Sequence, residues 1–557
     1  MSTEDSGARS PERASPARAR ARLAIEAAFV GLIALAGRLP AIDHAPYVDE
    51  LNHVLAARSF LEDGTMRVAD GAAAYERAWL FTRLVAEFFR LFGESLVVAR
   101  LPAVIAGAAI VVLLFLWVRS FAGRLSAWIA ALLLCFSPGA LFLSQLCRFY
   151  SFQALFFLAG ALCVLRLSSR PLSRPRTLAA VVGAGVFFSL ALHLHKLSVV
   201  GVGAVGLWAV LALVPWALRA RGRSRLILVA VSLAALASLL AGAPQVLSRA
   251  RLYWAMFNQV DIWAAGDRGN LRYYHWLFLE QYATIWALFP VFSLLAIRVR
   301  RREAGFCLAV FGLAFAVQSL AAWKSERYLF YAMPFFFAIV GVGLGEAIPW
   351  LLSAFEDAVR SAGLFVRRAA AARACAVVLA LFAAAFAVAG SGAFSFASRM
   401  VAGSDAHWPF ERTYRGEPDW RAAARHLRDA REEGAVLVGS SDLKALYYFG
   451  RLDYALSYDL RGDSRRVSPE FAPHWKTLVP VVSEPESLRR IVDSHPSGLV
   501  VVEKKQIRKS WGVPAPAADF LEQNLEEVPL PPEWRLRAFR WGVAEARGKA
   551  PSGEPAR

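Results

Sequence analysis

Long apolar segments separated by short charged connectors dominate the first 391 residues of the chain. Windows such as 103–117, 178–192 and 226–240 consist almost wholly of Leu, Ala, Val, Ile and Phe, without polar alternation. Apolar runs of this length are typical of membrane-spanning helices. The pattern predicts about eleven spans, near residues 23–42, 98–118, 125–145, 150–168, 177–194, 197–217, 226–244, 281–297, 305–322, 328–348 and 374–391.

Two segments depart from this pattern. In the connector 43–97, residues 51–61 and 79–92 have apolar positions at roughly helical spacing, which predicts helices lying on the bilayer surface. From residue 392 to 546 we expect a small soluble α/β domain, because amphipathic and buried-strand patterns alternate there. Its predicted elements are a helix over 420–433, strands at 435–439 and 499–503, and an aromatic strand or helix end at 446–449. We expect residues 547–557 to form a frayed tail.

The distribution of arginine predicts the orientation in the membrane. Arginines fill the N-terminal tail 1–22 and alternate connectors, including 166–176 and 219–225. Basic connectors face the cytoplasm, which places the connector 43–97 and the C-terminal domain on the external side. An uncleaved, Arg- and Ala-rich chain of this kind fits a bacterial inner membrane, with a cytoplasmic N-terminus and a periplasmic or extracellular C-terminal domain.

Composition excludes several classes of protein. With 57% hydrophobic and 19% charged residues, the chain is neither disordered nor an ordinary soluble protein. The net charge of +19 lies in the membrane part, since residues 405–557 contain 24 basic and 23 acidic side chains. We therefore expect membrane lipids as partners, and no nucleic acid.

Adjacent carboxylates, Asp49 and Glu50, follow the first span. Neighbouring residues of a helix point to different faces, so one carboxylate can face a reacting group while the other orients a partner or a cation. Acidic residues at a helix start are also common as caps, and the residues alone leave both interpretations open.

Basic side chains on the predicted external side are the second candidate group. Arg148 lies between two apolar spans, where an unpaired arginine at bilayer depth costs about 2.5 to 3.5 kcal/mol. Lys324 and Arg327 share a short external turn, against the positive-inside trend. Such cations are typical of phosphate binding. The alternatives are snorkelling of Arg148 to the surface and a local ion pair of the turn with Glu326.

Histidines and aromatic residues supply further candidates. The spacing of His193 and His195, next to Lys196, is poor for a metal on a helix, which favours an interfacial turn with a substrate contact. The connector 245–280, which includes His275, is rich in Trp and Tyr. These rings can form a belt at the membrane interface or stack on sugar rings.

In their order and spacing these features resemble the GT-C superfamily of membrane glycosyltransferases, of the protein O-mannosyltransferase or aminoarabinose-transferase type (glycosyltransferase families 39 and 83). The resemblance covers about residues 25–345. Residues Ala78 and Trp79 depart from it, because the family has prolines there. The matching segments are Asp49-Glu50, Tyr75-Glu76-Arg77, Gly93-Glu94-Ser95, Arg100-Leu101-Pro102, Arg148-Phe149-Tyr150, and Lys324 with Arg327-Tyr328-Leu329.

The resemblance implies an enzyme that transfers a sugar, with inversion, from a polyprenyl-phosphate donor to a hydroxyl or amine acceptor on the external face. It implies Asp49 as the general base, with Glu50 orienting the acceptor or a divalent cation. Some relatives use a metal and others do not; Glu76 and His275 are the residues that we would assign to such a site. The implied substrate-binding residues are Arg77, Arg148, Tyr150, His195, Lys196, Lys324, Arg327 and Tyr328.

A transporter or flippase of a lipid-linked or amphipathic substrate is the alternative. Such proteins carry ionisable residues or Gly/Pro breaks in mid-span and internal repeats, whereas the acids and most bases here cluster at predicted span ends. A receptor or scaffold anchored by its spans is a third class. The sugar and the acceptor, whether protein, lipid A or another envelope glycan, stay open.

Overall fold

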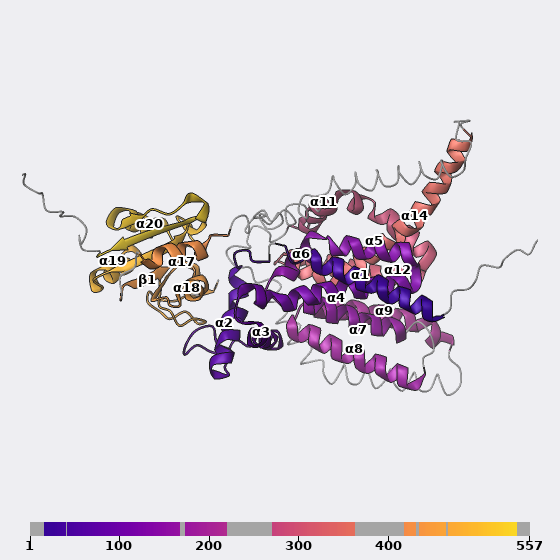
Figure 1. Cartoon of the computed structure of the whole chain (residues 1–557), viewed down its shortest axis with the longest axis horizontal. Helices are drawn as coiled ribbons and strands as arrows, with labels where there is room; N and C mark the ends of the chain where they lie inside the picture. Colours follow the sequence, from indigo (N-terminus) through magenta and orange to yellow (C-terminus); the bar gives the residue numbers. More distant parts are fainter. Residues whose placement is uncertain are drawn as a thin grey trace, which may run out of the picture.

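The computed structural model describes residues 16–40, 42–167, 173–219, 270–361, 417–429, 434–463 and 466–542. A bundle of helices is followed by a small α/β domain at the C-terminal end (Figure 1). The chain is thus a mostly helical, multi-pass membrane protein with a C-terminal sheet domain, as the apolar pattern predicted.

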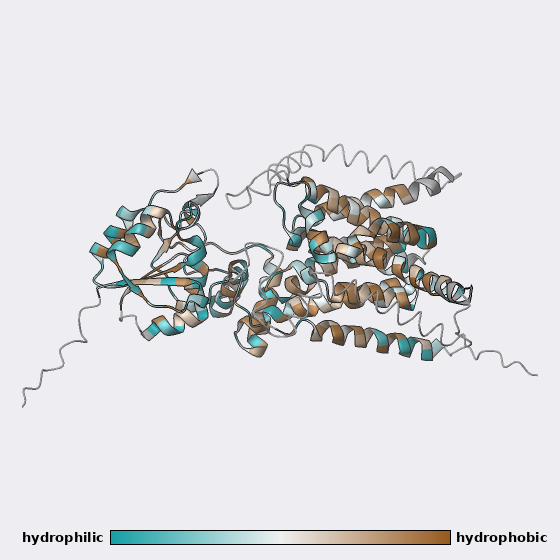
Figure 2. Ribbon diagram, turned by 90° about the horizontal axis from the view of Figure 1, so that it is seen from above, coloured by the Kyte–Doolittle hydropathy of each residue, from teal (hydrophilic) through white to brown (hydrophobic). Residues whose placement is uncertain are grey.

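The helices of the bundle are brown over most of their length when coloured by hydropathy (Figure 2). Four of them (α4, α7, α8 and α12) and the continuous α13–α14 segment are long and apolar enough to cross a membrane, and the bent pair α5–α6 makes a sixth if it counts as one span. The bundle consists of α1 (Pro16–Ala36), α2 (Val48–Asp63), α3 (Trp79–Phe92), α4 (Leu96–Ala122), α5 (Arg124–Cys135), α6 (Pro138–Gln145), α7 (Tyr150–Leu167), α8 (Arg174–Leu194), α9 (Ser198–Arg219), α11 (Tyr273–Ala287), α12 (Phe289–Leu320), α13 (Glu326–Leu329), the 3-10 turn η2 (Phe330–Ala332) and α14 (Met333–Ser361).

The predicted spans differ from the observed helices at several places. The span 281–297 includes the break between α11 and α12 at Leu288. The span 125–145 is broken into α5 and α6, which meet at 56°. Pro138 begins α6, and a proline disfavours helical backbone in the residue before it. The connector predicted at 298–302 is part of α12, where only Arg300 leaves helical geometry (φ −135°, ψ 56°). α1 ends at Ala36 rather than near residue 42, and its composition does not qualify it as a candidate span.

The predicted spans 226–244 and 374–391 lie outside the described residues. The total of eleven spans therefore stays a prediction. What the described residues establish is a multi-pass bundle that contains five or six candidate spans.

The connector 43–97 contains both predicted amphipathic helices. α2 and α3 pack against each other at the end of the bundle that faces the α/β domain (Figure 1). On α3 the apolar side chains of Phe81, Val85 and Phe89 are buried, whereas Leu91 and Phe92 are exposed. The first turn of α2 carries Asp49 and Glu50.

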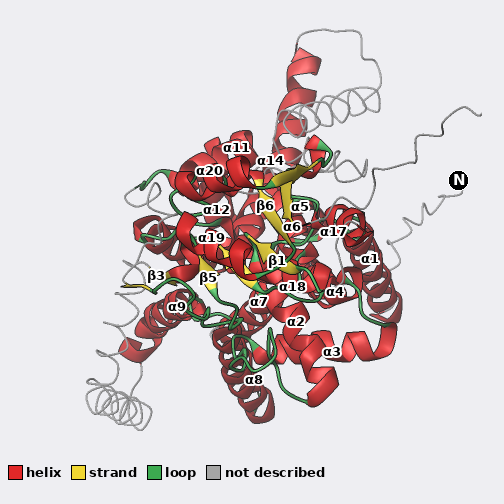
Figure 3. Cartoon of the chain, turned by 90° about the vertical axis from the view of Figure 1, so that its left-hand side faces the viewer, coloured by secondary structure: helices red, strands yellow, loops and turns green. Residues whose placement is uncertain are grey.

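The C-terminal domain is built on a six-stranded sheet with the strand order β5-β2-β1-β6-β8-β7. Figure 3 shows strands of this sheet, among them β1, β5 and β6, in yellow. The first four strands are parallel, and β8 pairs antiparallel with β6 and with β7. The helix over 420–433 is confirmed as far as residue 429, and residues 430–433 lie outside the described residues. The two strands were predicted correctly, and the aromatic segment 446–449 is a helix end. The elements are α17 (Trp420–Asp429), β1 (Val436–Gly439), α18 (Asp442–Phe449), β2 (Tyr454–Leu456), β3 (Gly462–Asp463), β4 (Arg466–Val467), β5 (Val481–Val482), α19 (Pro485–Ser494), β6 (Gly498–Glu503), α20 (Ala515–Asn524), β7 (Glu526–Val528) and β8 (Leu536–Trp541).

Alternate residues of the central strand β6 face opposite sides of the sheet. Leu499 and Val501 belong to the core covered by α17 and α18, whereas Val500 and Val502 belong to the core covered by α19 and α20. A period of two on a strand produces this division. The domain is therefore a sheet between two layers of helices.

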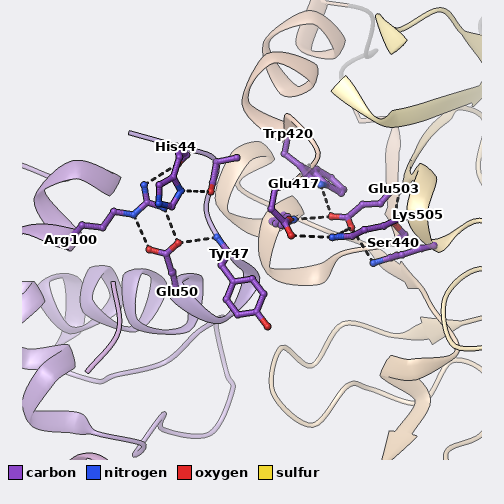
Figure 4. A network of polar contacts seen from close by, with 12 residues as sticks. His44, Tyr47, Glu50, Arg100, Glu417, Trp420, Ser440, Glu503 and Lys505 are labelled. Atoms are coloured by element: carbon purple, nitrogen blue, oxygen red, sulfur yellow. Dashed lines mark hydrogen bonds and ion pairs between the residues drawn. The ribbon is translucent and has the colours of Figure 1, made fainter. Parts of the chain in front are cut away.

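A buried polar network lies beside the first of these cores (Figure 4). Lys444 donates to Glu503 Oε1 at 3.0 Å and also pairs with Glu417. Trp420 Nε1 donates to the same Glu503 oxygen at 2.9 Å. Buried charges need partners of this kind to offset the loss of water.

Helix α18 joins the domain to the bundle. Leu443 belongs to the core of the bundle, and Ala445 belongs to the core of the C-terminal domain. α18 packs against α2, and the guanidinium of Arg58 on α2 lies 5.4 Å from the ring centre of Tyr447. The acidic pair on α2 is thereby held next to the C-terminal domain.

Candidate active site

The acidic pair sits in the first turn of α2, which begins after Tyr47. The backbone N–H of Tyr47 donates to Glu50 Oε1 at 2.9 Å, the reciprocal contact of a capping box. This contact turns the Glu50 side chain back toward the helix start. Because the two acids are adjacent, Asp49 faces a different set of neighbours.

Glu50 is paired with Arg100 of α4, and neither side chain is exposed (Figure 4). Arg100 Nε and Nη2 each donate to one carboxylate oxygen at 2.8 Å, and the N–H of Cys147 donates to Oε2 at 2.6 Å. Arg100 also donates to the carbonyl oxygens of residues 42 and 44. Burial alone would raise the pKa of Glu50, but Arg100 holds it below its usual value. The four hydrogen bonds leave this carboxylate little capacity for a substrate or a cation.

Asp49 is the more accessible acid, with 31% of its side chain exposed. Its Oδ2 lies 3.4 Å from Arg327 Nη1 and 3.6 Å from Arg148 Nη2. Arg148 Nη1 also donates to the Asp49 carbonyl oxygen at 2.9 Å. Burial would raise the pKa of Asp49, but the cations of Arg148, Arg327 and Arg77 outweigh it and hold the pKa well below its usual range. Asp49 is therefore ionised at neutral pH.

Aromatic rings support the arginines. The Arg148 guanidinium lies 5.0 Å from the ring centre of Phe149 and 5.5 Å from that of Tyr150. Arg77 lies 5.4 Å from the Phe149 ring. Tyr75 is half-buried beside Arg148, and burial raises the pKa of its phenol. A guanidinium group is attracted to the face of an aromatic ring and keeps its positive charge there.

His195 and Tyr328 also belong to the cluster of arginines and aromatic rings around Asp49. The His195 ring is 5.8 Å from Tyr150 and 5.9 Å from Tyr328, between ring centres. Arg327 lies 5.3 Å from the Tyr328 ring. Burial lowers the pKa of His195 well below its usual value, and nearby arginines add to the effect. His195 is therefore neutral at pH 7 and can donate or accept a hydrogen bond.

The remaining candidates are placed differently. Lys196 is exposed, and Lys324 is buried with its ammonium donating to the carbonyl of Ala321 at 2.5 Å. Glu76 is exposed, while the His275 ring packs against Trp286 and Phe315 on α11 and α12.

No group of three or more His, Cys, Asp or Glu side chains in the described part of the chain could hold a metal ion. Glu76 and His275 would supply only two ligands, and we derive no step through a metal.

Sequence reasoning did not single out Arg100, Tyr75 or Phe149 as functional residues. Arg100 had a signal, because an arginine in the first turns of a long apolar helix requires an anionic partner. Tyr75 and Phe149 had none, because an aromatic residue beside a cation is not distinguishable in sequence from a packing residue. The structure brings both of them to Arg148.

The chain shares its fold with solved structures of GT-C membrane glycosyltransferases. ArnT from Cupriavidus metallidurans in the apo state has a TM-score of 0.56 and 17% identity, covering 94% of this chain and 98% of that one. The same protein bound to undecaprenyl phosphate has a TM-score of 0.57 and 16% identity, with 96% and 100% covered.

A third match is the archaeal oligosaccharyltransferase AglB from Archaeoglobus fulgidus, in complex with an inhibitory peptide and a dolichol-phosphate. Its TM-score is 0.52 at 12% identity, covering 88% of this chain and 70% of that one. No protein-family model and no curated protein matches the sequence. At these identities the likeness establishes the GT-C fold, in agreement with the resemblance seen in the sequence.

Proposed function

We propose that the protein is a glycosyltransferase that moves a sugar from a polyprenyl-phosphate donor to an acceptor on the external face of the membrane. The observation that carries the proposal is the cluster of Arg148, Arg327 and Arg77 around the accessible carboxylate of Asp49. Two proteins of the same fold were solved with polyprenyl phosphates, undecaprenyl phosphate in ArnT and dolichol-phosphate in AglB. The arginines supply the charge that such a phosphate needs.

In the proposed reaction an acceptor hydroxyl or amine attacks the anomeric carbon of the donor sugar. The new bond forms as the bond from the anomeric carbon to the phosphate oxygen breaks, and its electron pair leaves with the polyprenyl phosphate. Asp49 accepts the proton of the acceptor, and attack from the face opposite the phosphate inverts the anomeric centre. Arg148, Arg327 and Arg77 stabilise the charge that develops on the leaving phosphate.

The other residues of the site have supporting roles in this proposal. Tyr150, Tyr328 and His195 position the sugar and phosphate, and Lys324 and Lys196 add to the positive charge of the site. Glu50 acts through its pair with Arg100, which fixes the start of α2 and so the direction of Asp49. Glu50 is thus a positioning residue rather than a ligand for acceptor or cation.

The proposed topology accounts for the two-part architecture. Eleven spans place residues 1–22 in the cytoplasm and the domain 392–546 outside a bacterial inner membrane, with the catalytic bundle over 23–391. The lipid tail of the donor then stays in the bilayer, while its phosphate and sugar reach Asp49 at the end of the bundle near α2 and α3. A soluble acceptor approaches from the side of the C-terminal domain.

The test is sugar transfer or hydrolysis from a panel of labelled polyprenyl-phosphate sugars by the protein in lipid nanodiscs. One donor should be consumed by the wild type, and Asp49→Asn should lower turnover by about 10²- to 10⁴-fold. Asp70→Asn removes an exposed carboxylate of the same connector and should leave turnover unchanged. Wild-type turnover by Asp49→Asn would remove Asp49 as the base, and a wild type that consumes no donor and binds none would favour a transporter.

A further inference from the structure

A β-hairpin of the C-terminal domain reaches the Asp49 cluster. Residues 471–474 pair with 479–481 through backbone hydrogen bonds, among them Phe471 N to Val481 O at 2.9 Å and His474 N to Val479 O at 2.9 Å. Its tip is a five-residue turn closed by Leu478 N donating to His474 O at 2.8 Å. Phe471 and Leu478 both have left-handed backbone, at φ 64° and 57°. Non-glycine residues adopt this conformation where surrounding contacts hold them.

Buried polar contacts lock the tip to α18. His474 Nδ1 lies 3.1 Å from Asp442 Oδ2 and 3.1 Å from Thr477 Oγ1. All three side chains are buried. Asp442 is the first residue of α18, the helix that packs against α2. These contacts fix the position of the tip on α18, and through α18 its position relative to α2, the helix that carries Asp49.

The tip also contacts the external connector of the bundle. A Cβ added at Gly71 would lie 3.5 Å from Leu478 Cδ1. Lys476, at the centre of the tip, is close enough to Asp49, Arg148 and Arg77 to interact with all three electrostatically. Burial lowers the pKa of Lys476; Asp442 and Asp49 oppose this effect, and the two arginines add to it.

The charges around Lys476 do not balance. In the described part of the chain no carboxylate forms an ion pair with Lys476, and its ammonium lies 5.2 Å from the ring centre of Trp475, which is 75% exposed. The two carboxylates that act on Lys476 electrostatically also have other partners, Asp442 in His474 and Asp49 in Arg148 and Arg327. A set of cations that exceeds its carboxylates at a partly exposed site favours an anionic ligand.

We propose that Lys476 is a substrate-binding residue contributed by the C-terminal domain, and that it contacts a phosphate group held on its other side by Arg148 and Arg77. This inference rests on the proposed function for the identity of the phosphate as that of the lipid donor. A phosphate on the acceptor would have the same chemistry at this position. In either case the ligand bridges the bundle and the C-terminal domain.

The experiment measures binding of undecaprenyl phosphate and of glucose 1-phosphate to the full chain in nanodiscs, with the variants Lys476→Gln, Lys476→Arg and Lys509→Gln. Lys509 is an exposed lysine of the same domain and controls for the loss of one charge. We expect Lys476→Gln to weaken binding by about tenfold or more, Lys476→Arg to restore most of it, and Lys509→Gln to bind like the wild type. A loss of binding of undecaprenyl phosphate supports the lipid donor as the source of the phosphate. A loss confined to glucose 1-phosphate, with undecaprenyl phosphate bound as by the wild type, shows that Lys476 binds a phosphate other than that of the lipid carrier.

Unchanged binding of both ligands by Lys476→Gln would overturn the inference, and unchanged melting of each variant shows that the fold is retained. The sugar-transfer assay separates this failure from that of the proposed function. If the wild type transfers sugar and Lys476→Gln binds both ligands as the wild type does, the inference about Lys476 fails and the proposed function stands. If Lys476→Gln binds phosphate more weakly but the wild type transfers no sugar, the proposed function fails and the inference about Lys476 stands.

Discussion

Asp49 Oδ2 and Arg327 Nη1 lie 3.4 Å apart, although 278 positions separate the two residues in the chain. The contact joins the first turn of α2 to α13, the short helix that leads into α14. It also creates a conflict, because a carboxylate held by arginines is a weak proton acceptor. A bound phosphate would relieve the conflict by neutralising the arginines.

This conflict predicts a difference between two pH profiles. In the free protein the cations hold the pKa of Asp49 well below its usual range, so the acid limb of kcat/KM should lie at very low pH. Phosphate binding removes part of that effect, so the acid limb of kcat, which reports the complex, should lie at higher pH. Rates measured from pH 3 to 8 should show the acid limb of kcat, with the donor above saturation, whereas the acid limb of kcat/KM, with the donor below saturation, should lie below this range. Acid limbs at the same pH, or in the reverse order, would contradict the proposed coupling.

Removing the arginine should affect the donor more than the acceptor. We expect Arg327→Ala to lower kcat/KM for the lipid donor by about tenfold to a hundredfold, because a charge-assisted contact to phosphate is lost. The acceptor KM should change little, and Arg327→Lys should recover part of the loss. Arg490→Ala, an exposed arginine of the C-terminal domain, is the matched control. An unchanged donor KM and rate in Arg327→Ala would exclude Arg327 from phosphate binding.

The buried pair of Glu50 and Arg100 should matter for stability. Truncating Glu50 to Ala leaves the Arg100 cation buried without its partner, a change that costs about 3 to 5 kcal/mol in comparable pairs. The melting temperature in detergent should fall clearly for Glu50→Ala and for Arg100→Ala. Glu62→Ala, an exposed acid on the same helix, should melt like the wild type. Wild-type melting of Glu50→Ala would show that the pair does not hold α2.

Acid should weaken the C-terminal domain through Glu503. Burial would raise the pKa of Glu503, but Lys444 and its other partners lower it to about 2, against 4.5 for an ordinary glutamate. A depressed folded-state pKa means that the stabilisation is complete above pH 4.5 and is lost as pH falls toward 2. The loss amounts to no more than about 3 kcal/mol. Thermal melting of the full chain between pH 2 and 7 should show it, and Glu503→Gln should be less stable at pH 7 with a flatter acid dependence. A dependence as steep as that of the wild type would assign the effect to other groups.

Local patterns were sufficient to predict the helix that carries Asp49 and elements in both parts of the molecule. The spacing of apolar residues in 51–61 and 79–92 predicted α2 and α3, and the apolar run 499–503 predicted β6. Arg148 was found because an arginine between two apolar spans is costly without a partner, and Arg327 because the positive-inside rule makes a cation on the predicted external side unusual. These signals depend only on neighbours in the sequence or on a rule for the whole membrane.

The partners of these residues could not be predicted, because a contact between residues far apart in the chain produces no repeating pattern in the sequence. Nothing in the sequence relates Glu50 to Arg100, and the hairpin at 471–481 has only short strands with prolines at 473 and 480. Helix boundaries failed for a different reason. The arginines near residue 300 suggested a loop, but helical hydrogen bonding continues on both sides of one non-helical residue.

Leu443 and Ala445 of α18, two positions apart, belong to the hydrophobic cores of different parts of the molecule. The C-terminal domain is consequently not an interchangeable module, although its sequence pattern begins abruptly after the last predicted span. A chimera that takes this domain from a relative would need a matching surface on α2 as well, and α2 is the helix that carries Asp49. A change of the C-terminal domain therefore requires a change in the helix that holds the proposed base.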